Sequence, residues 1–503
     1  MARRRVLVIG GGFGGLSAAI RLAASGATVV VLEQRDAIGG RAGTYRLTGS
    51  AGEHVFDAGP TVLTAPHLFE ELFTLAGQRL ADHVELLPVD PFYRVFGPDG
   101  QRLDYRRDVR AMRAEIEHIR PRDGEGFSRL TRRSAGIYDA LYPFTERDMM
   151  NPALMLGMLP YLAGNRAFLP VYPAVAGEVR DPFVRQALSF HPLLIGGSPM
   201  STPALYLLIP HLERTYGVHH AAGGTTALVA ALGRLLEDLG GTVRLNSRVT
   251  QILLAHRRAV GVRLEDGSTE LADAIVCNQD AAMAMRTLLP PQPRTRLAAA
   301  RAGMLRPSMS LAVLYVGIGR RYHHTDLLHH NVLVTGSYRG AIRSAFSGRA
   351  WSDGQVPDDL FLYAHLPSRL DRSVAPAEGE TMYVLAAVPS GDDIDWEHTA
   401  PLLKQRIYDG LEPHLPGLRR HVSVEHMVDP RFFGGALSSD HGAAFASAPT
   451  LLQSGWFRPH NRSRAARGLY LVGAGTHPGA GLPAVLASGR IAANLVLRDQ
   501  GLR

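Results

Sequence analysis

Three glycines near the start of the chain, followed by one acidic residue, have the spacing of a nucleotide-binding turn. Gly10, Gly12 and Gly15 form the pattern GxGxxG directly after an apolar run, and Glu33 ends the next apolar run. Such glycines permit a tight turn, a close approach of the backbone to a pyrophosphate, and close packing of a helix on a strand. An acid in the position of Glu33 accepts hydrogen bonds from a ribose hydroxyl and disfavours a ribose phosphate. The pattern predicts a dinucleotide site.

Two later motifs favour FAD over NAD. The stretch "DAIGGRAGTYR" adds a glycine pair and an arginine placed to wrap a diphosphate, and "FDAGPTVLT" follows where an NAD dehydrogenase would continue its alternation of strands and helices. Near the C-terminus a glycine loop leads into a helix whose positive dipole end suits the anionic edge of a reduced flavin. These motifs add to the expected FAD-binding residues Gly40, Arg41, Gly59, Pro60, Gly473, Gly475 and Leu482.

Other reactive side chains are scarce, and this narrows the chemistry. Lys404 is the only lysine, which excludes a Walker A phosphate loop and disfavours Schiff-base catalysis. Cys277 is the only cysteine, so neither an intramolecular disulfide nor a redox-active cysteine pair is available. The histidine pairs 323–324 and 329–330 lie on an expected loop without the carboxylate spacing of a metal site. We therefore expect surface or packing histidines and no metal.

The strands and helices that position these motifs are distributed along the whole chain. Apolar runs predict strands at residues 6–9, 27–32, 274–277 and 469–472, and helices at 16–24 and 483–497. We predict an α/β protein with a Rossmann-like FAD-binding domain assembled from discontinuous segments and an inserted α+β substrate domain. The expected FAD-binding segments are 1–80, 215–290 and 460–503, and the expected substrate-domain segments are 81–214 and 291–459. The site should lie at the carboxyl ends of the parallel strands.

The overall composition is that of a globular protein with a basic surface. The formal net charge is +8, and 46% of the residues are hydrophobic. The arginines are interleaved with acids and no nucleic-acid module accompanies them, so we expect no nucleic acid partner and favour attraction to anionic lipid. The arginine-rich start does not read as a signal peptide, which predicts a cytoplasmic protein.

Two long stretches are nearly free of charge. Residues 149–177 contain only Arg166 as a charged residue, and residues 186–212 contain none. Prolines interrupt every window of the ~20 apolar residues that a membrane span needs. Two interpretations remain open. The stretches form a buried core helix and loop, or they form a surface that dips into one leaflet or lines an apolar tunnel.

Taken together, the motifs resemble the FAD-dependent amine-oxidase-like superfamily and, more closely, the bacterial and fungal phytoene desaturases of carotenoid biosynthesis. The resemblance covers nearly the whole chain and is most specific in "LLPVDPFYRVF", "WFRPHNR" and "GAGTHPGAGLP". It implies FAD-dependent desaturation of phytoene toward neurosporene or lycopene, by hydride transfer to flavin and loss of a proton. It also implies that Val249 presents its backbone to the adenine of FAD.

The same resemblance implies a lipophilic carotenoid substrate and peripheral association with the membrane, because exposure of each CH₂ to water costs ~0.8 kcal/mol. The electron acceptor would be oxygen or a quinone. Arg147, Asp148 and His441 are polar residues that could assist the departing proton, although an ordinary ion pair, helix cap or buried hydrogen bond is the better explanation of each.

Several alternatives share the flavin motifs. The chain could be another desaturase acting on a hydroxylated or partly desaturated carotenoid, or a carotenoid isomerase or ketolase. An amine or porphyrinogen oxidase and a redox-silent carotenoid carrier are further alternatives. The chain departs from the resembled family in "YGVHHAAGG", where His219 and His220 stand in place of an aromatic and proline-rich lead-in. We expect this segment to lie near the flavin.

Overall fold

One half of the molecule is built on a five-stranded sheet whose strands come from distant parts of the chain. The computed structural model describes residues 4–97, 100–391 and 393–501. The strand order is β19–β13–β1–β2–β9, and every neighbouring pair is parallel. The strands are β1 (Arg5–Ile9), β2 (Thr28–Leu32), β9 (Thr242–Arg244), β13 (Ala274–Cys277) and β19 (Leu469–Leu471). The sheet is therefore assembled from discontinuous segments, as the predicted fold class requires.

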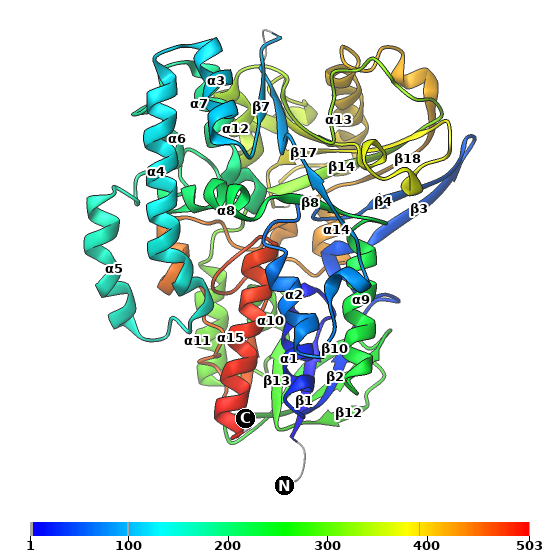
Figure 1. The fold of residues 1–503 in the computed structure, drawn as a ribbon. Helices are drawn as coiled ribbons and strands as arrows, with labels where there is room; N and C mark the ends of the chain where they lie inside the picture. Colours follow the sequence, from blue (N-terminus) through cyan, green and yellow to red (C-terminus); the bar gives the residue numbers. More distant parts are fainter. Residues whose placement is uncertain (1–3, 98–99, 392, 502–503) are drawn as a thin grey trace.

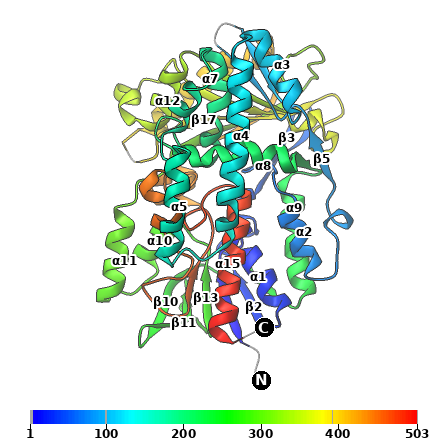
Figure 2. The same cartoon turned by 60° about the vertical axis from the view of Figure 1, so that its left-hand side comes forward.

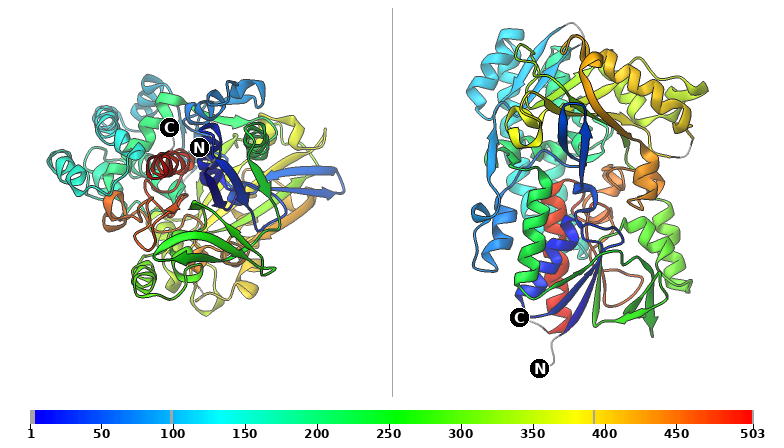
Figure 3. Two further views of the ribbon diagram at one scale, coloured as in Figure 1. Left: turned by 90° about the horizontal axis from the view of Figure 1, so that it is seen from below. Right: turned by 90° about the vertical axis from the view of Figure 1, so that its right-hand side faces the viewer.

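Helices cover one face of this sheet, and a small antiparallel sheet covers the other (Figure 3, right). The helices are α1 (Phe13–Ala24), α9 (Thr225–Asp238) and α15 (Leu482–Gln500), and the small sheet consists of β10 (Val249–Ala255), β11 (Arg258–Leu264) and β12 (Thr269–Leu271). The side chains of β1 pack alternately into two hydrophobic cores, one on each face of the sheet. Val6 and Val8 pack with the helices, whereas Leu7 and Ile9 pack with the small sheet. Burial on both faces explains why this strand is apolar throughout.

The other half is built on a seven-stranded mixed sheet ordered β18–β14–β17–β16–β15–β6–β7 (Figure 1). The β15–β6 pair is parallel, and the other pairs are antiparallel. The strands are β6 (Tyr93–Phe96), β7 (Arg102–Tyr105), β14 (Ser310–Ile318), β15 (His330–Val334), β16 (Phe361–His365), β17 (Glu380–Val388) and β18 (Val422–Val428). One face packs on α3 (Val109–Ile119), α4 (Asp123–Leu141), α6 (Val171–Ala176), α7 (Pro182–Ser189) and α12 (Tyr338–Phe346), and the other on α13 (Trp396–Leu411).

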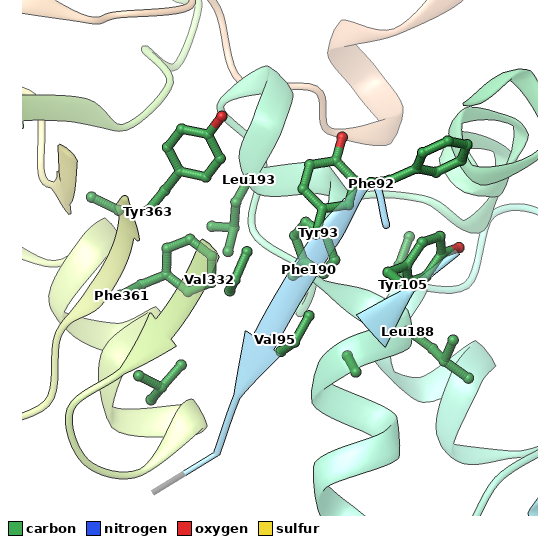
Figure 4. Close-up of a cluster of buried hydrophobic side chains, with 14 of the residues drawn as sticks. Phe92, Tyr93, Val95, Tyr105, Leu188, Phe190, Leu193, Val332, Phe361 and Tyr363 are labelled. Atoms are coloured by element: carbon green, nitrogen blue, oxygen red, sulfur yellow. The ribbon is translucent and has the colours of Figure 1, made fainter. Parts of the chain in front are cut away.

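Aromatic side chains fill the core on the helical side of this sheet (Figure 4). The ring of Tyr93 on β6 lies edge-on to Phe190, with centroids 5.2 Å apart, and 6.2 Å from the ring of Tyr105 on β7. Such edge-to-face pairs add stability beyond the area that they bury. This core holds β6 and β7 rigidly beside β15 and β16.

Two short antiparallel sheets of two strands each connect the halves. One pairs β3 (Thr44–Gly49) with β4 (Gly52–Asp57), and the other pairs β5 (Leu86–Val89) with β8 (Val218–Ala221). The α/β fold class is confirmed, while the domain boundaries stay a prediction. The helix expected at residues 16–24 begins earlier, at Phe13, because Gly14 and Gly15 form its first turn.

The two uncharged stretches differ in their burial. Residues 186–212 are mostly buried, whereas residues 149–177 include α5 (Pro152–Gly164), which stands out from the body (Figures 1 and 2). Leu156 and Leu159 on this helix are 61% and 46% exposed. No helix in the described part of the chain combines the length and the apolar run needed to cross a bilayer.

Candidate cofactor and substrate site

A cavity of about 450 Å³ lies where the two halves meet. Its volume is within the ~300–1,000 Å³ range of small-molecule sites. One end is lined by the glycine turn after β1 and by the residues that end β2 and β13, the carboxyl edge where open parallel sheets bind ligands. The other end is walled by the mixed sheet, which contributes alternate residues of three strands: Leu311, Val313 and Tyr315 of β14, Phe361 and Tyr363 of β16, and Tyr383, Leu385 and Ala387 of β17.

The glycine turn leaves no space for side chains. A Cβ at Gly15 would lie 2.2 Å from the carbonyl oxygen of Gly10, and one at Gly12 would lie 2.9 Å from Nδ2 of Asn278. Gly12 is the N-cap of α1, and no described side chain hydrogen-bonds to this cap. The N–H groups of the first helical turn are therefore free to bind an anion at the cavity.

Glu33 is held at the end of β2 by two backbone donors. Its Oε2 accepts from the N–H of Gly11 at 2.7 Å, and its Oε1 accepts from the N–H of Arg35 at 3.0 Å. The side chain is buried and lines the cavity. A fixed carboxylate at this edge can accept further hydrogen bonds from a sugar hydroxyl, since each oxygen has two lone pairs.

Arg41 is a half-buried cation that faces the same end. Its guanidinium donates to Oγ of Ser439, while Nε has no hydrogen-bond partner among the described residues. Burial lowers the pKa of Arg41, and the carboxylate of Asp280 opposes this shift. A Cβ at Gly59 would lie 1.9 Å from the carbonyl oxygen of Arg41, so the two segments touch along their backbones. An arginine whose Nε is a buried and unused donor suits a diphosphate, and this observation fits FAD to the site.

The C-terminal glycine loop reaches the cavity through Gly473, Gly475 and Leu482. Arg458, from the "WFRPHNR" motif, is fully buried and holds this loop by donating to the carbonyl oxygens of Ala474 at 2.6 Å and Thr476 at 3.1 Å. The loop leads into α15, whose N-cap Gly481 carries no side-chain cap in the described structure. A second positive helix end thus faces the cavity.

The far end of the cavity is apolar, with a small polar group on one wall. Oγ1 of Thr61 is hydrogen-bonded to the hydroxyls of Tyr363 at 3.0 Å and Tyr383 at 2.9 Å. The apolar lining comes largely from the second uncharged stretch and from residues near 433–445: Leu193, Leu194, Ile195, Leu208, Ile209, Leu212, Phe433, Leu437 and Phe445. Residues 186–212 therefore fit both interpretations of an uncharged stretch, because they are buried and line the cavity.

The cavity brings together nearly all the residues expected to bind FAD. Gly10, Gly12, Glu33, Gly40, Arg41, Gly59, Pro60, Val249, Gly473, Gly475 and Leu482 line it. Gly15 does not, because it lies under the turn where it contacts Gly10. Its place agrees with the packing function expected of a third glycine. The binding functions themselves stay predictions.

The cavity lining in the described structure includes none of the residues expected to assist the proton. Arg147 is exposed and stacks its guanidinium 5.7 Å from the ring centroid of Phe144. Asp148 accepts from the N–H of Met150 at 3.1 Å. His441 is exposed, 3.8 Å from Asp440. These contacts are those of a surface cation, a local turn and a surface ion pair, so their catalytic assignment stays a prediction that the geometry does not favour.

Other sequence expectations concern cysteine and histidine. Cys277 is buried in β13, and burial raises its thiol pKa to about 12, which agrees with a packing role. His323 and His324 are exposed, whereas His329 and His330 are buried. His219 and His220 are not among the described residues that line the cavity, and the expectation that their segment lies near the flavin stays a prediction. The segment pairs with β5 and lies behind the cavity wall.

Several site residues escaped the sequence analysis. Asn278 follows β13 directly, lines the cavity and donates to the carbonyl of Gly10 at 3.3 Å, a place that its position after a predicted strand could have indicated. Glu213 is a buried carboxylate on the wall, bound by the hydroxyl of Tyr93 at 2.7 Å and by His191 at 3.1 Å. No local pattern marks Glu213, because its partners come from other elements.

Known proteins resemble this chain over its whole length. It matches the family described as flavin containing amine oxidoreductase over residues 13–497. It is 43% identical to a lycopene-forming phytoene desaturase of Pantoea ananas, covering 98% of this chain and 99% of that protein. It is 38% identical to a neurosporene-forming phytoene desaturase of Cereibacter sphaeroides, covering 98% of this chain and 94% of that protein.

Solved structures share the fold. An oxidoreductase from Methanosarcina mazei superposes with a TM-score of 0.65 at 16% identity, covering 98% of this chain and 100% of that one. At this identity the likeness concerns the fold alone. It extends over both halves of the molecule and so includes the boundary where the cavity lies.

Proposed function

The chain belongs to the flavin containing amine oxidoreductase family, and we propose that it is an FAD-dependent carotenoid desaturase that converts phytoene toward neurosporene or lycopene. The observation that carries the proposal is full-length similarity to phytoene desaturases in a chain whose cavity joins a nucleotide-binding end to an apolar end. A hydrocarbon substrate needs such an apolar wall, because it has no polar group to bind.

The residues proposed to hold FAD divide by the part of the cofactor that they face. The N–H groups after Gly12 and the guanidinium of Arg41 bind the diphosphate, Glu33 binds a ribose, and the backbone of Val249 faces the adenine. The start of α15 faces the flavin ring with its positive end. When bound, FAD supplies the acceptor for the hydride that leaves one carbon while a proton leaves its neighbour.

The chain's own residues position the substrate and exclude water. The strand residues of the mixed sheet and the leucines of residues 186–212 enclose the hydrocarbon, while Thr61, Tyr363 and Tyr383 form the polar group beside it. This hydroxyl cluster supplies the hydrogen-bond donors and acceptors of this wall. The enclosure disfavours side reactions with water.

The membrane-facing surface that we propose is centred on α5. Leu156 and Leu159 are joined by the exposed Phe168 and by Phe457, which is 42% exposed on the turn Gly455–Phe457 that contacts α5. Contiguous exposed apolar side chains of this kind mark interaction sites. Arg166, exposed beside them, can extend its guanidinium to lipid headgroups. We propose a cytoplasmic protein that associates peripherally with the membrane and draws its substrate from it.

The remaining elements of the proposal follow from the chemistry. Each desaturation leaves two electrons on the cofactor, and we propose oxygen or a membrane quinone as their acceptor, since Cys277 is the only cysteine and a redox-active pair is absent from the sequence. We keep residues 1–80, 215–290 and 460–503 as the FAD-binding domain, and residues 81–214 and 291–459 as the substrate domain.

The test is an incubation of purified, FAD-loaded protein with phytoene in liposomes, followed by the absorption spectrum of the extracted pigments. The proposal predicts new polyene bands that appear stepwise, and the last band identifies neurosporene or lycopene as the product. A colourless extract from protein with intact flavin would contradict it. Lycopene, neurosporene and their hydroxylated forms would then be tested as substrates of the alternative desaturase.

A further inference from the structure

Three buried histidines from distant parts of the chain meet behind the tyrosine wall of the cavity. His220 lies on β8, His329 directly precedes β15, and His365 ends β16. One ring nitrogen from each lies within 4.8 Å of the others, and the Nε2 atoms of His329 and His365 are 3.1 Å apart. All three side chains are at most 5% exposed. The fold therefore brings three imidazoles together in the protein interior, where solvent is excluded.

Each histidine of this cluster has one ring nitrogen without a hydrogen-bond partner among the described residues. These nitrogens are Nε2 of His220 and the Nδ1 atoms of His329 and His365. The Nε2 atoms of His329 and His365 are hydrogen-bonded to each other, and a bound cation would replace the proton that they share.

Two buried carboxylates stand beside the imidazoles. Oδ2 of Asp371 lies 3.6 Å from Nε2 of His220 and accepts from the N–H of Gly223 at 2.7 Å. Asp57 accepts from the backbone N–H and the hydroxyl of Thr225. Neither carboxylate has an arginine or lysine nitrogen within 4.0 Å in the described structure. Buried charges are ordinarily paired or bound to a metal, so the cluster calls for a positive ion.

We propose that His220, His329, His365 and Asp371 bind one divalent transition metal ion, and that the ion is zinc. Three imidazole nitrogens and one carboxylate oxygen make a four-coordinate set of zinc donors with bonds of about 2.0–2.1 Å. In a tetrahedral site the donor atoms lie about 3.4 Å apart, which falls between the 3.1 Å and 4.8 Å found among the three histidines. Rotation of the rings completes the geometry while the strands stay in place.

The ion would have a structural function. β8 leads through Gly223 into α9 of the nucleotide-binding half, whereas β15 and β16 belong to the mixed sheet, and Asp371 caps the short helix Arg372–Val374. One ion therefore cross-links segments of both halves. His330 lies between the cluster and the cavity, with its Nδ1 2.6 Å from the hydroxyl of Tyr363, so the metal stands behind the wall and away from the substrate.

The test is metal analysis of the full-length, FAD-loaded protein carrying no histidine tag. We expect about one zinc ion per chain after growth or dialysis with zinc. Zinc K-edge absorption should show only nitrogen and oxygen donors at about 2.0–2.1 Å, with no sulfur, since Cys277 lies elsewhere. A folded, FAD-retaining protein that contains no transition metal and takes up no zinc would overturn the proposal.

Variants locate the ion. His220→Asn and His365→Asn should each lose it, because removing even a group that only hydrogen-bonds to a metal ligand weakens affinity about 10–100-fold. His219→Asn, on the same strand, and the exposed double variant His323→Asn/His324→Asn should keep it. Retention of the ion by the His220 and His365 variants would also overturn the proposal. If those variants fail to fold, the metal content and the absorption spectrum of the unmodified protein decide.

Discussion

Replacing Gly15 by alanine tests the nucleotide turn most sharply. The added Cβ would lie 2.2 Å from the carbonyl oxygen of Gly10 and 3.3 Å from Cβ and Nδ2 of Asn278. Ordinary contact between heavy atoms begins at about 3.5 Å. The carbonyl oxygen is backbone and cannot turn aside, so α1 must move by about 1 Å relative to β1.

That displacement sets the expected magnitude. Overpacking a close contact costs about 1–3 kcal/mol. If the shift moves the first-turn N–H groups away from the diphosphate, the same energy weakens FAD binding by about 5- to 150-fold. Gly303→Ala is the matched control, because Gly303 is exposed at the end of α11 (Pro293–Gly303) and its Cβ would meet no heavy atom within 4 Å.

The assay is titration of the apoprotein with FAD, followed by flavin fluorescence, together with the thermal unfolding midpoint of each variant. Gly15→Ala should bind FAD more weakly and unfold at a lower temperature than Gly303→Ala. Equal FAD affinity and equal unfolding midpoints in the two variants would refute the packing argument for this turn.

The remaining predictions concern the surface, the thiol and acid stability. Leu156→Asp/Leu159→Asp should reduce sedimentation with anionic liposomes, whereas Leu271→Asp, exposed on β12, should not; equal sedimentation of all three proteins would argue against the α5 surface. Cys277, with its pKa raised to about 12, should resist iodoacetamide at pH 8 in the folded protein and react after denaturation, so rapid labelling of the native protein would contradict its burial. Burial lowers the pKa of His330 to about 3, whereas this histidine binds a proton near pH 6.5 in the unfolded chain. The contribution of neutral His330 to the free energy of unfolding is therefore complete above pH 6.5 and decreases as the pH falls toward 3. The urea concentration at the unfolding midpoint should decrease as the pH is lowered from 7.5 to 4.5, and it should decrease less in His330→Gln. An unchanged midpoint in the unmodified protein would count against the burial of His330 in its neutral form.

The nucleotide-binding half could be predicted from the sequence because its signals are local. The glycine spacing, the apolar runs of β1 and β13, and Glu33 at the end of β2 each depend on residues within a few positions of one another. The sequence does not show which face of the sheet each strand residue occupies. Because both faces are buried, the strands still appear as continuous apolar runs. The sequence therefore located most of the residues that line this end of the cavity, while their binding functions stay predictions.

The substrate wall and the histidine cluster depend on long-range pairing. Thr61 meets Tyr363 across about 300 positions of the chain, and His329 reaches His365 only because β16 pairs with β15. Arg147 and Asp148 were singled out by their place next to an uncharged stretch. That stretch continues into the exposed α5 and away from the cavity, and the catalytic assignment of both residues stays a prediction.

The most direct test of the account is a single turnover without an electron acceptor. FAD-loaded protein is mixed anaerobically with phytoene in liposomes, and the flavin and polyene absorbances are followed together. The account predicts loss of the oxidised flavin band with one double bond formed per flavin, and further desaturation only after an acceptor is added. Polyene formation while the flavin stays oxidised, or bleaching of the flavin without any new polyene, would contradict it.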